Sequence, residues 1–197
     1  MAKTVDKELM RENIIQAAIN AFLKNGVNNS TMELIAKEAN IAKGTLYLYF
    51  NSKQELISAC NVAHYTERKA LLMLPKIFDS LDELLEHVSK SLFIKKKMAE
   101  YIKIFFEAFG AQLSTKSFTD EYNSFFEEIA NSYEQSLKNL IKKGLVKDSI
   151  NTFTFSRTMV SMMDGLTLHR GFFDIDDERY KGMVNDTVQM YRAILER

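Results

Sequence analysis

The stretch that decides the fold runs from Ser30 to Lys53 and reads STMELIAKEANIAKGTLYLYFNSK. Ser30, with Glu33 three places on, forms a capping-box pattern, so a short helix is predicted over residues 31–39. Asn40 then suits the left-handed position that commonly ends a helix. The residues of this helix that recur at helical spacing, and are expected to face a small core, are Leu34, Ile35 and Ala39.

A second short helix is predicted over residues 43–49. Leu46 and Phe50 lie four residues apart, so both are expected to face inward. The residues that fall on the opposite, solvated face are Lys43, Gly44 and Tyr47. Two short helices joined by a tight turn form a helix-turn-helix, whose second helix enters the major groove of DNA. The stretch therefore predicts a DNA-binding element.

The same stretch resembles the DNA-binding signature of the tetracycline-repressor (TetR) family of bacterial transcription regulators. The matching residues are Thr31, Ile35-Ala36, Ala39, Gly44-Thr45-Leu46-Tyr47, Tyr49-Phe50 and Ser52-Lys53. Two positions depart from the family pattern. Asn40 stands where the family usually has Gly, which the turn tolerates, and Ala42 stands where the family usually has Ser. Ala has no oxygen with which to cap the second helix.

The resemblance implies an all-α protein with two parts. Residues 1–52 are expected to form a three-helix DNA-binding head, and residues 53–197 a helical ligand-binding and dimerisation domain. Phosphate contacts position such a protein, and base contacts give it sequence preference. We expect base contacts from Lys43, Gly44 and Tyr47, and phosphate contacts from Thr31, Thr45, Tyr49 and Lys53. Lys7 and Arg11 are either solvated surface residues or further phosphate contacts.

Composition narrows the class of protein. Of the 197 residues 46% are apolar, and one Pro and seven Gly favour long helices. The 26 basic and 26 acidic residues balance, so the whole chain gives no sign of a polyanionic partner. A single cysteine, Cys60, excludes an internal disulfide. A charged N-terminal segment and the lack of a long apolar run predict a cytoplasmic protein that does not enter a membrane.

The rest of the chain is predicted to be helical, and its last two helices are expected to pair with their copies in a homodimer. The further helices are predicted over residues 7–25, 53–73, 81–93, 98–110, 118–143, 152–172 and 177–196. The residues expected at the dimer interface are Met159, Leu166, Met183, Val184, Val188, Tyr191 and Leu195. Gly165 inside a helix costs roughly 1 kcal/mol relative to Ala, so close approach of another helix is expected there.

Many of the aromatic and Met residues lie after residue 70, where they are either an ordinary helical core or the wall of an adaptable apolar cavity. The resemblance implies such a cavity for a small ligand. The expected wall is uncharged and is made by Phe105, Phe109, Phe126 and Met163, with Tyr133 or His169 as a polar contact.

No pattern of catalytic, cofactor-binding or metal-binding residues emerges from the sequence. Cys60 and His64 lie four residues apart on one helix face, but two ligands do not make a metal site. As a member of this family the protein is expected to be no enzyme, and to act as a homodimeric repressor that a small apolar ligand releases from operator DNA. The alternatives are an activator or a protein-controlled regulator of the same fold, and an enzyme or carrier that uses the cavity.

Overall fold

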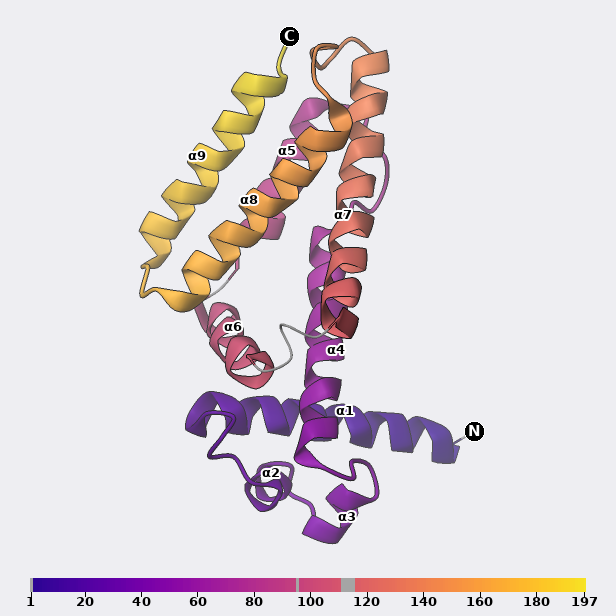
Figure 1. Cartoon of the computed structure of the whole chain (residues 1–197), viewed down its shortest axis with the longest axis vertical. Helices are drawn as coiled ribbons and strands as arrows, with labels where there is room; N and C mark the ends of the chain where they lie inside the picture. The colour runs from indigo at the N-terminus through magenta and orange to yellow at the C-terminus, as the bar shows by residue number, and fades with distance from the viewer. Residues whose placement is uncertain (1, 95, 111–115) are drawn as a thin grey trace. The chain divides into compact units, whose positions relative to one another are not determined.

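The structure is a computed structural model that describes residues 2–94, 96–110 and 116–197, and in these ranges every regular element is a helix (Figure 1). The helices are α1 (Ala2–Asn25), α2 (Met32–Glu38), α3 (Lys43–Tyr47), α4 (Lys53–Leu72), α5 (Leu81–Leu92), α6 (Lys96–Phe109), α7 (Lys116–Lys142), α8 (Thr152–Phe172) and α9 (Asp177–Leu195). The predicted all-α fold is confirmed. Within the described ranges, no helix combines the length and apolar character that crossing a bilayer requires.

The chain divides into two compact units. The first comprises Met1–Glu67 with Lys103–Ala111, and the second comprises Arg68–Ile102 with Gln112–Arg197. The divisions fall inside α4 and α6, so both helices pass from one unit into the other. The functional boundary between residues 52 and 53 stays a prediction.

The core of the first unit forms around α1. The fully or nearly fully buried side chains of this unit include Ile14, Ala18, Phe22, Ile35, Leu46, Phe50, Leu56 and Ile104. Gly26 ends α1 at a φ of +77°, and Asn40 follows α2 at a φ of 54°. Both are left-handed conformations that Gly and Asn adopt more easily than other residues. The predicted turn position at Asn40 is therefore confirmed.

The start of α2 differs from the prediction. Thr31 is the N-cap, and its Oγ1 accepts a hydrogen bond from the Leu34 amide at 3.2 Å. Ser30 is fully buried, and its hydroxyl lies 3.1 Å from the carbonyl of Ala21 and 2.8 Å from that of Gly26. The capping-box prediction is wrong because this hydroxyl bonds to the end of α1 instead. Leu34 is 43% exposed, so the prediction that it faces the core is also wrong.

In the second unit α8 packs along α7, and α9 packs against α5 (Figure 1). Its fully buried core residues include Leu84, Val88, Ile129, Leu137 and Met163. Two buried tyrosines of α9 also bond to the backbone of neighbouring helices. The Tyr180 hydroxyl donates to the carbonyl of Leu92 at 2.7 Å, and the Tyr191 hydroxyl donates to that of Met159 at 3.0 Å. These bonds hold α9 against α5 and α8.

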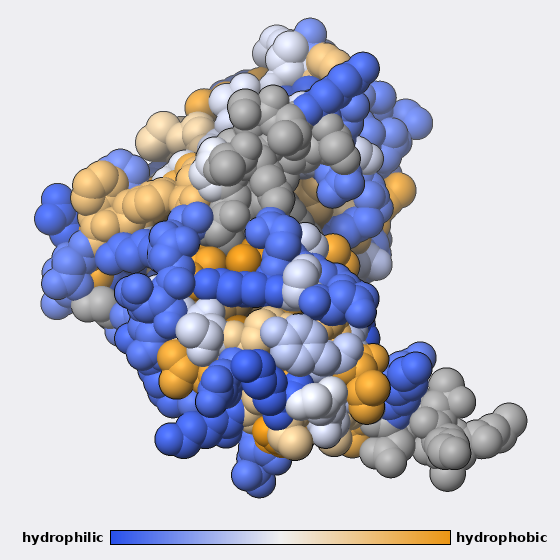
Figure 2. All heavy atoms as spheres, turned by 60° about the horizontal axis from the view of Figure 1, so that its bottom comes forward, coloured by the Kyte–Doolittle hydropathy of each residue, from blue (hydrophilic) through white to orange (hydrophobic). Residues whose placement is uncertain are grey.

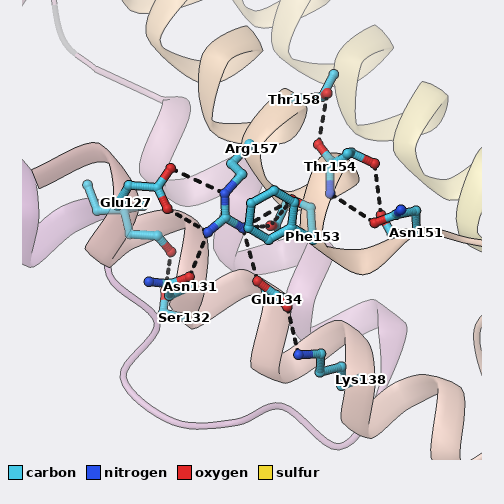
Figure 3. A network of polar contacts seen from close by, with 12 residues as sticks. Glu127, Asn131, Ser132, Glu134, Lys138, Asn151, Phe153, Thr154, Arg157 and Thr158 are labelled. Atoms are coloured by element: carbon cyan, nitrogen blue, oxygen red, sulfur yellow. Dashed lines mark hydrogen bonds and ion pairs between the residues drawn. The ribbon is translucent and has the colours of Figure 1, made fainter. Parts of the chain in front are cut away.

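Arg157 of α8 is the centre of a polar network with α7 (Figure 3). Its guanidinium donates to Glu127 Oε2 at 2.5 Å, to Asn131 Oδ1 at 2.8 Å and to Glu134 Oε2 at 3.0 Å. The same group lies 3.7 Å from the ring centroid of Phe153. The planar guanidinium has five N–H donors, so one side chain bonds to successive turns of α7. The network fixes the register of α8 on α7.

We expect the replacement Glu134→Gln to destabilise the protein in a pH-dependent way. Hydrogen bonds from Lys138 and then from Arg157 hold the pKa of Glu134 below its ordinary value of 4.5. A carboxyl with a lowered native pKa stabilises the fold above its unfolded pKa, and this contribution is lost as the pH falls through the native pKa. The variant should lose about 1 kcal/mol at pH 7 and progressively less as the pH falls through the lowered native pKa.

Urea unfolding at pH 7, 5 and 3.5, followed by circular dichroism, measures this difference. Glu121→Gln is the control, because Glu121 is an exposed carboxylate on the same helix. A loss of stability in Glu134→Gln that is the same at all three pH values contradicts the expectation.

Candidate nucleic-acid interface

Two buried side chains, one in α3 and one just after it, anchor this helix in the first unit. Leu46 and Phe50 are both 0% exposed, as predicted from their spacing. Lys43 and Gly44 are exposed, and Tyr47 is 43% exposed, so the predicted outward face is confirmed as a surface. Because the inward residues are anchored in the core, the outward ones hold fixed positions relative to one another. Their contact with bases stays a prediction.

Arg11 of α1 supports the end of α3 from the side. Its guanidinium lies 4.3 Å from the ring centroid of Phe50 and donates to the carbonyl of Tyr49 at 3.4 Å. An open groove beside it is lined by Lys7, Glu8, Arg11, Leu48 and Tyr49. Lys7 and Arg11 therefore lie next to the predicted phosphate contact Tyr49. This position agrees with the alternative in which these two cations contact phosphates and are not merely solvated.

The other side chains predicted to hold phosphates are those of Thr31, Thr45 and Lys53. Thr31 is exposed and Thr45 is half-buried. The Lys53 ammonium donates to the carbonyl of Asn28 at 3.2 Å. An ammonium has three N–H donors, so two remain for a phosphate after this bond. Phosphate contact by these residues stays a prediction.

A larger open groove lies between α2 and α3. Its lining residues are Thr31, Glu33, Leu34, Ala36, Lys37, Asn40, Ile41 and Lys43. Lys43 Nζ lies 3.6 Å from Glu33 Oε2, and both side chains are exposed. Such surface ion pairs contribute about 0–1 kcal/mol, so a DNA phosphate can replace Glu33 at little cost. Figure 2 brings this end of the molecule forward and shows mostly hydrophilic residues with small separate hydrophobic patches.

The helix α3 begins without a side-chain cap, as its sequence predicts. Ala42 is the N-cap residue, with an extended backbone and no side-chain hydrogen bond. We expect Ala42→Ser to raise the free energy of unfolding by about 0.5–2 kcal/mol, since the serine hydroxyl can accept a hydrogen bond from a free backbone amide of the first turn. Urea unfolding measures the change, with Ala42→Val as the control that adds bulk but no oxygen. Equal stability of the Ser and Val variants contradicts the expectation.

Comparison with known proteins shows which family the helix-turn-helix region resembles. Residues 14–60 match the family described as "Bacterial regulatory proteins, tetR family". This region of the chain is a DNA-binding domain of the TetR family. The nicotine-responsive transcriptional repressor HdnoR of Paenarthrobacter nicotinovorans is 23% identical over 192 residues, which cover 95% of each chain. The fatty acid metabolism regulator protein of Bacillus subtilis (strain 168) is 26% identical over 145 residues, which cover 70% of this chain and 69% of the relative.

Solved structures of TetR-family proteins share the fold. The structure of a TetR transcription regulator from Haloarcula marismortui ATCC 43049 superimposes with a TM-score of 0.76 at 16% identity. The superposition covers 96% of this chain and 100% of that chain. The likeness therefore extends well beyond the helix-turn-helix, into both units.

The predicted ligand-contact residues of this TetR-family regulator are divided between the two units. Phe105 lies in the first unit, where its ring meets that of Phe106 edge-on at 5.5 Å. Tyr133 and Met163 are both 0% exposed in the core of the second unit, and Phe126 packs half-buried against that core. The side chain of Phe109 lies outside the described residues. A shared wall made by these residues stays a prediction.

Two observations concern the polarity of the predicted ligand site. His169 is exposed, and its ring lies 4.8 Å from that of Phe173. A charged pair lies within the second unit, where Arg68 is 8% exposed and lies 3.8 Å from Asp164. The uncharged wall and the polar contact by His169 stay predictions. Sequence reasoning missed Arg68, although it stands four residues before the fully buried Leu72 on the same stripe of α4. The four-residue spacing to Leu72 was the signal that could have identified Arg68 as buried.

The predicted dimer residues separate into two groups. Met159, Val184, Tyr191 and Leu195 are 0–2% exposed in the core of the single chain, so their assignment to an interface is wrong. Leu166, Met183 and Val188 are half-buried, and their role in an interface stays a prediction. Among the residues that the structure describes, no atom lies within 4 Å of a Cβ added to Gly165 or Gly182, so none of them makes the close approach expected at Gly165.

Proposed function

We propose that the protein is a homodimeric repressor that binds operator DNA through α3 and releases it when a small apolar ligand binds the second unit. The observation that carries the DNA-binding part is the outward face of α3, which is anchored by the fully buried Leu46 and Phe50. A recognition helix must be held firmly for its side chains to reach base edges in the major groove. The repressing and ligand-responsive parts are supported by the name of the relative HdnoR, a nicotine-responsive repressor.

The homodimer is proposed to form through α8 and α9. Gly165 and Gly182 leave open surface on these helices, where a second backbone can approach closely. Met190 and Ile194 of α9 are 50% and 44% exposed, and a partner that covered them would remove apolar surface from water. A two-fold interface is self-complementary, and it sets two recognition helices at the spacing of about 34–36 Å that successive major grooves require.

A shift assay with the DNA upstream of the protein's own gene and of its neighbours tests the proposal. We expect binding without added ligand and release when an apolar compound that stabilises the protein is added. Binding that no such compound weakens favours the alternative, an activator or a regulator controlled by a protein partner. Turnover or ligand transport without affinity for any DNA overturns the proposal in favour of an enzyme or carrier.

A further inference from the structure

The short loop between α1 and α2 is held by a residue that lies far along the chain. The backbone amide of Asn28 in this loop donates to Glu107 Oε1 at 3.3 Å. Glu107 belongs to Lys103–Ala111, the segment of the first unit that comes from α6. Ile104, three residues before Glu107, is 7% exposed in the core of the same unit. The helix is therefore anchored in that core where Glu107 reaches the loop.

The carboxylate of Glu107 lies beside the end of α1. A Cβ at Gly26 would lie 3.4 Å from Glu107 Oε1 and 3.6 Å from its Oε2. The C-terminal end of a helix carries a partial negative charge, so this neighbourhood is unfavourable for a carboxylate. The hydrogen bond from the Asn28 amide, and not attraction to α1, therefore accounts for the position of Glu107.

The backbone of Asn28 also binds the predicted phosphate contact Lys53. Lys53 is the first residue of α4, and its Nζ donates to the Asn28 carbonyl at 3.2 Å. Both backbone groups of Asn28 are thus used, the amide by α6 and the carbonyl by α4. A lysine side chain has many rotamers, and a bond that restricts it before DNA arrives lowers the entropic cost of holding a phosphate.

We propose that Glu107 is a positioning residue for DNA binding, which acts through Asn28 to hold Lys53 where it meets the phosphate backbone. The inference rests on the proposed DNA-binding function and adds to it a residue outside the helix-turn-helix. While Glu107 accepts the Asn28 amide bond, the loop keeps the Asn28 carbonyl within reach of Lys53. Without that acceptor the loop moves and Lys53 loses its fixed partner. Since phosphates carry no sequence information, binding then weakens for DNA of every sequence.

Fluorescence anisotropy of the full chain tests the inference with two duplexes, the DNA upstream of the protein's own gene and an unrelated sequence of equal length. We expect Glu107→Ala to weaken binding to both by about two- to tenfold, the range that one hydrogen bond spans. Glu107→Gln should bind at least as tightly as the wild type, because its amide oxygen still accepts and a negative charge near DNA is gone. Glu100→Ala is the control, since it removes an exposed carboxylate from the same helix.

A double-mutant cycle with Lys53→Ala separates positioning from a general effect on the fold. Glu107→Ala should cause no further loss of DNA affinity in the Lys53→Ala protein, and by itself it should lower the salt dependence of binding as Lys53→Ala does. If circular dichroism shows that Glu107→Ala does not fold, Glu107→Met, which has a similar length and no oxygen, takes its place. The inference is overturned if Glu107→Ala binds like the wild type, if Glu107→Gln loses as much affinity, or if the loss persists in the Lys53→Ala protein. A wild-type chain that binds neither duplex overturns the proposed DNA-binding function as well.

Discussion

Replacing Tyr47 by alanine should remove most of the sequence-specific operator binding and leave the fold intact. Tyr47 is 43% exposed on α3, and its inward neighbour Leu46 carries the packing. Each good base contact is worth about 1–3 kcal/mol of discrimination, and a homodimer loses the contact twice. We therefore expect a loss of about 2–6 kcal/mol for the operator and almost none for unrelated DNA. Fluorescence anisotropy with both DNAs, at one fixed salt concentration, measures this.

Two further variants in the first unit serve as comparisons for Tyr47→Ala. Leu9→Ala changes an apolar side chain that is 54% exposed on α1, outside the predicted face, so it should bind the operator normally. Lys53→Ala should weaken binding to all DNA and lower the salt dependence by about two units, one for each chain of the homodimer, because each phosphate contact releases counterions. Wild-type operator affinity in Tyr47→Ala shows that the recognition face lies elsewhere.

The double replacement Met190→Asp and Ile194→Asp should give folded monomers that lose the operator. Both side chains are about half exposed on α9, so a single chain tolerates the charges. A second chain cannot bury them without a large desolvation cost. Linking two half-site contacts in one dimer raises the apparent affinity by about 10²–10⁴, and a monomer loses that factor. Sedimentation velocity and operator titration measure the two effects.

The control for the dimer experiment is Lys181→Asp. Lys181 is exposed on α9, nine residues and therefore half a turn away from Met190. Tyr191→Asp is unsuitable, because Tyr191 is 2% exposed and its hydroxyl bonds to Met159, so this change would disrupt the fold itself. A wild-type protein that sediments as a monomer at micromolar concentration overturns the proposed assembly.

Local sequence rules predicted the helix-turn-helix well. The spacing of Leu46 and Phe50 is a property of one helix and its end, and both residues are fully buried. The turn position of Asn40 was likewise predictable, because its left-handed backbone conformation depends on the residue itself. Ser30 was misassigned, since its hydroxyl bonds to carbonyls at the end of another helix. A local cap and a tertiary bond compete for the same oxygen, and sequence alone shows only the first.

The second unit was harder to predict because its helices have more than one apolar face. Tyr191 and Met183 lie on the same predicted stripe of α9, yet one is 2% exposed and the other half-buried. Periodicity identifies a stripe but not which neighbour covers each part of it. Arg68 was missed for a related reason. A charged residue on a buried stripe contradicts the usual preference for the surface, and only its partners Thr167 and Asp164 explain its position.

The segment Lys103–Ala111 belongs to the first unit, although it lies far along the chain from the rest of it. Ile104 is 7% exposed in the core of that unit, and Glu107 Oε1 accepts a hydrogen bond from the Asn28 amide at 3.3 Å. A fragment that ends at residue 67 therefore lacks part of its own core. If the first unit were fused to a different ligand-binding domain, that domain would have to supply side chains that replace Ile104 and Glu107. Exchanging residues 1–67 of this chain alone would leave Lys103–Ala111 behind.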